Sequence, residues 1–405
     1  MINQRRSANA ESRLKLSHAS WLALVSAGYL AVIFWRSWSA LGRLPADPGY
    51  GHMEDALRNP LSIVFSTRET YLQILPRLIA EFVILFPIEY HAVVTASLVN
   101  LMWVACALVI AQVIYSETGD RLLSGLSGSI LLLVPAAMES ALGNIGNVKW
   151  AVTAAVATAY CSASALQRFR RSIITGTIIL GLTQPLLVVV CAPLIWQLTR
   201  TQSVTRRTAI LGLAAIFATF AAQIVVAGLD SASRGWGSAR VLAPWPNMGL
   251  FWWFGLLSPA LGAIVVTVVG TAPALRQSQR RQLWNLLAVN SVLLSVASYL
   301  LGGIADRYFV VPMTLTWIAG ALLLREFWGR FGSVGRLFAV AVILTLLVPT
   351  AKWSKAGWYL TSGKSWYSQV VAARVECEST DVYIVQIGVT PIGSYEIACE
   401  LLTDR

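Results

Sequence analysis

The amino-acid sequence predicts an all-α polytopic membrane protein with about eleven transmembrane helices and a small C-terminal β-hairpin. Hydrophobic residues make up 56% of the 405 residues and charged residues only 12%, about half the charged share of soluble domains. Apolar runs of about 20 residues recur along the whole chain, and each is long enough to cross a bilayer. These runs are continuous and do not alternate with polar residues, which excludes a membrane β-barrel.

The net charge of +12 gives the expected orientation, because it is concentrated in alternate connections between the apolar runs. Arg5, Arg6, Arg13 and Lys15 precede the first run, and no small-residue cleavage site follows it. We therefore expect a retained first span, a cytoplasmic N-terminus and a lipid bilayer, not a nucleic acid, as the surroundings of the chain. Nine single spans are expected, with boundaries good to a few residues, at about 20–35, 91–115, 122–138, 148–166, 208–229, 247–272, 283–303, 308–325 and 337–352.

One further apolar segment, residues 172–198, does not fit a single span. It is flanked by "QRFRR" and by "RTQSVTRR", so both of its ends should be cytoplasmic. Gln184-Pro185 lies at its midpoint, and a proline there breaks a helix. We predict a hairpin of two short helices, which brings the number of membrane helices to about eleven.

The odd number of helices places the C-terminal tail, residues 353–405, outside the cytoplasm, beyond a membrane domain of residues 1–352. Within the tail, "DVYIVQIGV", "TPIG" and "SYEIAC" predict a strand, a turn and a second strand. Cys377 and Cys399 flank this hairpin, and an oxidising compartment would allow them to form a disulfide. The alternative is two free thiols.

Residues 141–150, "ALGNIGNVKW", join the third and fourth spans on the expected outer face. Asn144 and Asn147 share one face if the segment is helical, and Lys149 and Trp150 follow them. Glu139 lies just before. Polar groups at membrane depth usually line an aqueous path or a binding site. The alternative is that the asparagines cap a helix and that the lysine extends toward the lipid headgroups.

The first outer loop, residues 36–80, is the longest connection and contains apolar stretches, so we expect interfacial helices within it. Its "MED" sequence places Glu54 beside Asp55, and Asp47 precedes them in "PADPG". Such carboxylates suit a general base, or a divalent cation such as Mg²⁺ or Mn²⁺. The alternative is a solvated acidic turn.

Two arginines are candidates for holding a phosphate on the same face. Arg77 lies at the end of the first loop, although a simple i, i+4 pair with Glu81 is an alternative. Arg307 and Tyr308 begin a late span directly after Asp306, and an arginine there suits either a phosphate or a surface pair with that aspartate.

Soluble catalytic signatures do not occur in this chain. The sequence contains no GxxxxGK[ST], HExxH or CxxC motif. His18, His52 and His91 are too widely separated along the sequence to predict a metal site.

Four short stretches and the architecture resemble the GT-C superfamily of integral-membrane glycosyltransferases, in a bacterial, actinobacterial-type branch. The stretches are "YLQILPRLIAE" at the end of the first loop, "ESALGNIGNVKW" after the third span, "DRYFVVP" opening a late span, and the tail with its paired cysteines. GT-C enzymes typically carry a DxD or ExD motif in the first loop. This chain has "MED" and "PADPG" in its place.

The resemblance implies an enzyme of the bacterial inner membrane that uses a polyprenyl-phosphate sugar donor and a glycan or lipid-linked acceptor on the extracytoplasmic face. It implies that Asp55, Glu54 or Asp47 is the catalytic base. The donor phosphate would be held by Arg307, Arg77 and Lys149. The sugar or acceptor would contact Asn144, Asn147, Trp150, Glu139 and Tyr308.

Two other classes of function remain open on the sequence. A polysaccharide polymerase or ligase would share the lipid-linked substrate, but usually has its large loop later in the chain. A flippase for lipid-linked glycans would show internal repeats and charges at the midplane. The sequence shows no repeat, and its charges lie at the ends of the spans.

Overall fold

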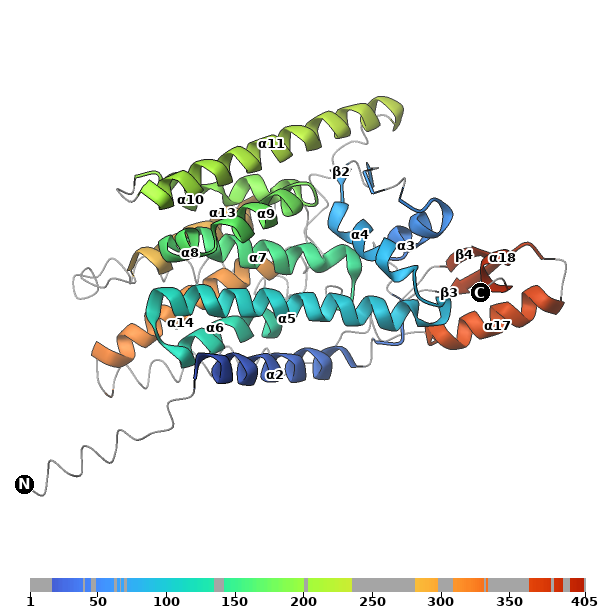
Figure 1. Cartoon of the computed structure of the whole chain (residues 1–405), viewed down its shortest axis with the longest axis horizontal. Helices are drawn as coiled ribbons and strands as arrows, with labels where there is room; N and C mark the ends of the chain where they lie inside the picture. The colour runs from blue at the N-terminus through green and yellow to red at the C-terminus, as the bar shows by residue number, and fades with distance from the viewer. Residues whose placement is uncertain are drawn as a thin grey trace, which may run out of the picture.

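The computed structural model describes residues 17–38, 41–44, 49–61, 64–65, 67–68, 71–134, 142–199, 203–234, 281–297, 309–330, 333, 364–379, 382–388 and 394–403. These residues form a bundle of roughly parallel and antiparallel helices with a small α/β tail at one end (Figure 1). The expected spans 247–272 and 337–352 lie outside the described residues.

The centre of the bundle is α5, His91–Thr118, which packs against α2, His18–Ser37, α6, Arg121–Leu133, and α7, Val148–Tyr160. Its hydrophobic residues run around all sides of the helix, as expected for a helix buried within a bundle. A second pair, α13, Arg281–Ala297, and α14, Val310–Arg330, packs onto α6 and α7. Figure 1 shows α2 and α5 lying along the long axis of the molecule.

Three helical segments are long and apolar enough to cross a membrane: His18–Ser37, Ile88–Thr118 and Ser203–Gly228. All three coincide with spans expected from the sequence. The expected span 148–166 is divided, however, because α7 ends at Tyr160 and α8 begins at Ala163. Ser162 caps α8 through a bond from the amide of Ala165 at 3.0 Å, and the carboxylate of Glu117 accepts its hydroxyl.

The segment 172–198 reverses direction as predicted. It contains α9, Arg170–Gly181, then the 3₁₀ helix η5, Pro185–Cys191, and α10, Ala192–Gln197. All three pack along α11, Ser203–Arg234. Gly181, at the end of α9, lies against Thr219 of α11. Leu194, in α10, lies against Gly212, which is two turns nearer the start of α11. The chain therefore turns back between residues 181 and 194. The break at Gln184-Pro185 is therefore the tip of a hairpin.

The first loop covers one end of the bundle with short elements. They are α3, Gly49–Arg58, the two-residue strands β1, Thr67–Arg68, and β2, Tyr71–Leu72, and α4, Ile74–Val83. The hairpin tip supports this loop, because the amide of Leu75 donates to Thr183 Oγ1 at 3.1 Å. From α11, Gln223 Oε1 accepts the amide of Leu72 at 2.8 Å.

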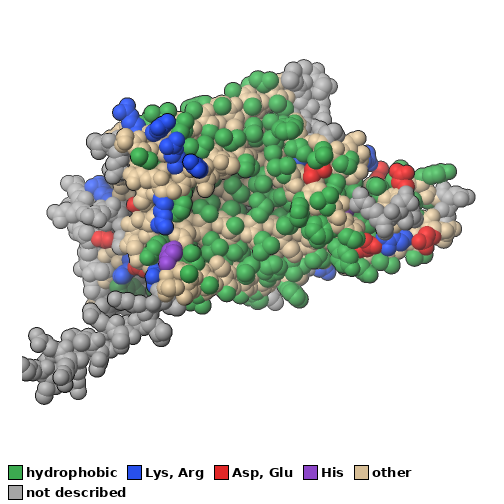
Figure 2. Space-filling view, viewed as in Figure 1, with side chains coloured by type: hydrophobic (Ala, Val, Ile, Leu, Met, Phe, Trp, Pro, Cys, Tyr) green, Lys and Arg blue, Asp and Glu red, His purple; other side chains and the backbone are tan. Residues whose placement is uncertain are grey.

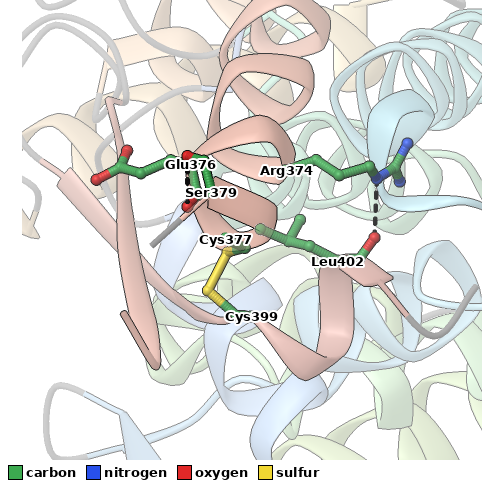
Figure 3. Close-up of a disulfide and its surroundings, with 6 residues drawn as sticks. All are labelled: Arg374, Glu376, Cys377, Ser379, Cys399 and Leu402. Atoms are coloured by element: carbon green, nitrogen blue, oxygen red, sulfur yellow. Dashed lines mark hydrogen bonds between the residues drawn. A yellow bond between two sulfur atoms is a disulfide. The ribbon is translucent and has the colours of Figure 1, made fainter. Parts of the chain in front are cut away.

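The tail lies at the same end of the molecule. It comprises α17, Trp366–Ser379, the antiparallel strands β3, Ile384–Gly388, and β4, Ser394–Ala398, and α18, Glu400–Thr403. This strand pair confirms the predicted β-hairpin. A disulfide joins Cys377 to Cys399, which follows β4, and Arg374 donates to the carbonyl of Leu402 at 2.8 Å (Figure 3).

Buried contacts fix the tail to the bundle. The indole of Trp366 donates to the carbonyl of Ile88, in the 3₁₀ helix η2, Ile88–Tyr90, at 2.6 Å. Arg374 forms an ion pair with Glu89 at 2.5 Å. The tail therefore packs directly onto the residues that precede α5.

The two ends of the molecule differ in charge. We call the end with α3, α4 and α17 the tail end, and the end with Arg168, Arg170, Arg171, Arg206 and Arg207 the arginine end. Figure 2 shows basic side chains gathered at the arginine end, acidic ones at the tail end and hydrophobic ones between them. This distribution is typical of a protein that crosses a membrane.

We predict that Gly128→Ala destabilises the bundle. A Cβ at position 128 would overlap the hydroxyl of Tyr29 on α2 and the carbonyl of Ala107 on α5, so three helices would have to separate. Overpacking of this kind costs roughly 1–3 kcal/mol. Thermal melting in detergent measures it. Gly28→Ala is the matched control, since no atom lies within 4 Å of the added methyl group; equal melting temperatures for the two variants would contradict the packing described.

We predict that the Cys377–Cys399 disulfide forms on the extracytoplasmic side. An impermeant maleimide should label neither cysteine in intact cells until a reductant is added, and both afterwards. Opening a loop of 22 residues should cost the folded tail about 3 kcal/mol, so proteolysis of the tail should accelerate on reduction. Labelling of both thiols without a reductant would contradict the pairing in the cell.

Candidate functional site

A group of polar side chains, all of them buried except that of Asp55, lies at the tail end, where α3, α4, the 3₁₀ helix η4, Ile145–Asn147, and the start of α7 pack together. We call it the tail-end polar cluster. Its members are His52, Asp55, Gln73, Arg77, Asn144, Asn147 and Lys149, with Tyr71 beside the lysine. Most buried polar groups in a membrane bundle are costly, so such a concentration marks a candidate site.

An ion pair between α3 and α4 is the main electrostatic feature of the cluster. Arg77 Nη2 lies 3.3 Å from Asp55 Oδ2. Only 3% of the Arg77 side chain is exposed, against 31% for Asp55. A buried guanidinium without a counter-charge would cost several kcal/mol. Asp55 therefore neutralises Arg77, and Arg77 in turn fixes the position of a carboxylate that remains accessible.

A second contact runs beside this ion pair. His52 Nε2 and Gln73 Oε1 are 3.1 Å apart, and both side chains are buried. His52 and Asp55 are three residues apart on α3, while Gln73 and Arg77 are four apart at the start of α4, so each pair faces the other. From its position in the sequence, His52 was not predicted to belong to a site. Its spacing from Asp55 is the signal that could have placed it here.

Glu54 has a different role from its neighbour. It pairs with Arg58 at 2.7 Å within α3, and Arg58 also lies 3.8 Å from Glu396 of β4. Glu54 thus contributes to the contact between α3 and the tail. Glu81 accepts the amide of Leu61 at 2.9 Å, whereas the carboxylate of Asp55 pairs with Arg77.

Residues 142–150 are buried and form one side of the tail-end polar cluster. Gly143 has φ of +71°, a conformation that glycine favours, and it turns the chain into η4. Asn144 caps η4 by accepting the amide of Gly146 at 3.0 Å. Asn147 Oδ1 accepts the indole N–H of Trp150 at 3.2 Å. The capping alternative for Asn144 is what the structure shows, and both asparagines are buried.

Lys149 lies in the same segment with 5% of its surface exposed. Its ammonium donates to Tyr71 Oη at 2.7 Å and lies 5.2 Å from the Tyr71 ring and 5.7 Å from the Trp150 ring. These cation–π contacts retain a positive charge inside the cluster. The lysine therefore does not extend freely toward lipid headgroups.

A third buried cation at this end is Arg36, at the C-terminal end of α2, which was not among the residues predicted from the sequence. Its side chain is 1% exposed, and Nη2 donates to the carbonyl of Val134 at 3.4 Å. Within the described part of the chain, its Nε and Nη1 atoms find no partner and no carboxylate pairs with it. The position of this arginine in the last turn of the first span was the sequence feature that could have indicated a candidate site residue.

Four candidate residues from the sequence lie outside the described residues: Asp47, Glu139, Arg307 and Tyr308. Among the residues that are described, no group of three His, Cys, Asp or Glu side chains is placed to hold a metal ion. The described cluster therefore offers one accessible carboxylate, Asp55, together with three buried cations, Arg36, Arg77 and Lys149, at one end of a membrane bundle.

Comparison with known proteins gives little further information. No protein-family model matches the sequence, and no curated protein shows significant similarity to it. A solved structure, the oligosaccharyltransferase of Archaeoglobus fulgidus in complex with Zn and sulfate, is similar with a TM-score of 0.46 and 12% identity, over 89% of this chain. The similar region spans 56% of that protein. Similarity at this level is too low to carry an activity, a substrate or a site residue across to this chain.

Proposed function

We propose that the protein is a membrane glycosyltransferase that moves a sugar from a polyprenyl-phosphate donor to a glycan or lipid-linked acceptor of the cell envelope. The observation that carries the proposal is the accessible carboxylate of Asp55 held by a buried arginine, with two further buried cations, Arg36 and Lys149, at the same end of the bundle. A sugar transfer from a lipid phosphate needs both a base and cations at the membrane surface. Its donor is also amphipathic, which suits a site at the end of a bundle.

We assign each residue a role in this transfer. Asp55 accepts the proton of the acceptor hydroxyl while the acceptor oxygen forms its bond to the anomeric carbon. The bond from that carbon to the phosphate oxygen breaks, and the phosphate leaves with the electron pair. Arg77 positions Asp55 and so is a positioning residue. Arg36, Lys149 and, from the sequence, Arg307 neutralise the leaving phosphate.

The remaining candidates have supporting roles in this proposal. Asn144 accepts a backbone amide, and Asn147 accepts the indole N–H of Trp150. We therefore assign these three residues to holding the segment that carries Lys149. Asp47 stays an alternative base, and Glu139 and Tyr308 stay candidates for sugar contact. A divalent cation would require oxygen ligands in addition to Asp55.

The proposed orientation places the tail end outside the cytoplasm. The arginine end then follows the positive-inside rule, and the disulfide of the tail lies in an oxidising compartment. The N-terminus is cytoplasmic and the tail extracytoplasmic, in a bacterial inner membrane.

We predict that Asp55→Asn lowers transfer of labelled sugar by about 10²–10⁴-fold, the usual contribution of a general base. The assay uses a polyprenyl-phosphate sugar and membranes that lack the native enzyme. Glu54→Gln is the matched control, because the adjacent carboxylate pairs with exposed Arg58 and should be dispensable.

Asp55→Asn also removes the counter-charge of Arg77, so loss of activity could reflect loss of folding. The double variant Asp55→Asn/Arg77→Gln removes both charges and should recover melting temperature without recovering activity. Full activity of Asp55→Asn and Glu54→Gln would move the base to Asp47. If no first-loop carboxylate matters, a polymerase, ligase or flippase function becomes the better proposal.

We predict that Arg36→Gln raises the KM for the donor by roughly tenfold or more, because a charge-assisted bond to phosphate contributes about 1.5–3 kcal/mol. Arg36→Lys should restore part of this, since it keeps the charge and loses the planar fork. Arg58→Gln, at an exposed arginine of the same end, is the control. An unchanged donor KM in Arg36→Gln, with a raised melting temperature, would assign Arg36 a purely structural role.

A further inference from the structure

A cavity of about 640 Å³ lies between α10 and α13, away from the tail-end polar cluster. Pro193 and Trp196 line it from α10, and Arg281, Asn285, Leu286 and Val289 line it from α13. Trp196 is 52% exposed, so the cavity opens at the side of the bundle. Its volume is within the range of small-molecule sites.

The lining of the cavity changes from charged to apolar along α13. Arg281 is the first residue of the helix, and Asn285 and Val289 follow at intervals of four, so the three lie on one face. Leu293 and Val296 continue this apolar face and are 39% and 51% exposed. From residue 281 to residue 296 the helix rises about 22 Å, enough to cover one leaflet of about 15 Å.

An unsatisfied polar atom lies in the charged part of the cavity. Asn285, which lines the cavity, has a buried Oδ1 that lacks a hydrogen-bond partner among the described residues. A buried acceptor without a partner is unfavourable. A polar group of a ligand, or water that accompanies it, would satisfy this atom.

The surrounding charge favours an anion. Arg281 forms no ion pair with any residue that the structure describes, and the same end carries a second, smaller cavity of about 360 Å³ lined by Arg168, Arg170 and Arg171. Gln167 donates to Thr205 at 2.9 Å, which places those arginines beside Arg206 and Arg207. Basic pockets between membrane helices on the cytoplasmic side bind anionic lipid headgroups.

We propose that the cavity between α10 and α13 binds an anionic phospholipid. Its phosphate lies at Arg281, its polar backbone at Asn285, and one acyl chain along Val289, Leu293 and Val296. The exposed apolar face distinguishes this ligand from a free phosphate, which would use only the first turn of α13. The proposal does not depend on the glycosyltransferase function, because it concerns the opposite end of the bundle.

The test counts lipids on the purified full chain by native mass spectrometry. Protein in a neutral detergent is titrated with phosphatidylglycerol or phosphatidylcholine. We expect one phosphatidylglycerol to bind at least tenfold more tightly than phosphatidylcholine. Arg281→Gln should abolish this preference, whereas Arg207→Gln, at an exposed arginine of the same end that does not line the cavity, should keep it.

A second variant separates binding from folding. Val289→Trp fills the apolar part of the cavity without changing its charge, so it should weaken phosphatidylglycerol binding while the melting temperature in lipid-free detergent stays within a few degrees. Retained tight binding in both Arg281→Gln and Val289→Trp would overturn the proposal. Equal competition by inorganic phosphate would show an anion site without a lipid chain, and tenfold preference for a polyprenyl monophosphate would exclude a phospholipid as the ligand.

Discussion

The buried guanidinium of Arg77 is the constraint on which the packing of α3 against α4 depends at the tail end. It lies on α4 with almost no contact with solvent, and an unpaired charge there would destabilise the fold by several kcal/mol. Asp55 supplies the compensating charge from α3, a helix of ten residues that would not be stable alone. The helix is thus held in place by electrostatic contacts, with the His52–Gln73 bond beside the ion pair. The need to neutralise Arg77 is what keeps a carboxylate at this surface.

Support for α4 comes from the hairpin inside the bundle. Pro185 cannot donate a backbone hydrogen bond, so the helix of α9 ends before it and leaves Leu182 and Thr183 at a turn. Thr183 then receives the amide of Leu75, and Gln223 of α11 bonds both to Leu72 and to the carbonyl of Gly181. The helix break between α9 and η5 therefore helps to determine where the first loop lies.

Local sequence patterns predicted most of the helices and the hairpin, because hydrophobic runs, basic flanks and one central proline are properties of neighbouring residues. They also predicted the strand pair of the tail. The division at Cys161–Ser162 was missed, since it depends on Glu117 from another helix. For the site, Asp55, Arg77 and Lys149 were selected as chemistry-bearing residues, but their partners were not. The Asp55–Arg77 pair requires α3 to fold back on α4. The two residues are 22 positions apart, and a separation of that length does not by itself predict a contact. Arg36 was missed because a single charged residue at the end of a span gives no periodic signal, and His52 was missed because its partner Gln73 lies on another element.

The contact of α3 with the tail bears on the order in which the protein is completed. Arg58 on α3 meets Glu396 on β4, so a helix made early in synthesis borders a strand that is made more than three hundred residues later. Contacts of such long sequence separation form slowly, since the loop between them must close first. The first loop therefore spends the whole of membrane insertion without one of its neighbours. Under the proposed orientation, α3 reaches its final surroundings only after the last strand has crossed the membrane and Cys399 has met Cys377, so maturation of the site is tied to export and thiol oxidation of the tail.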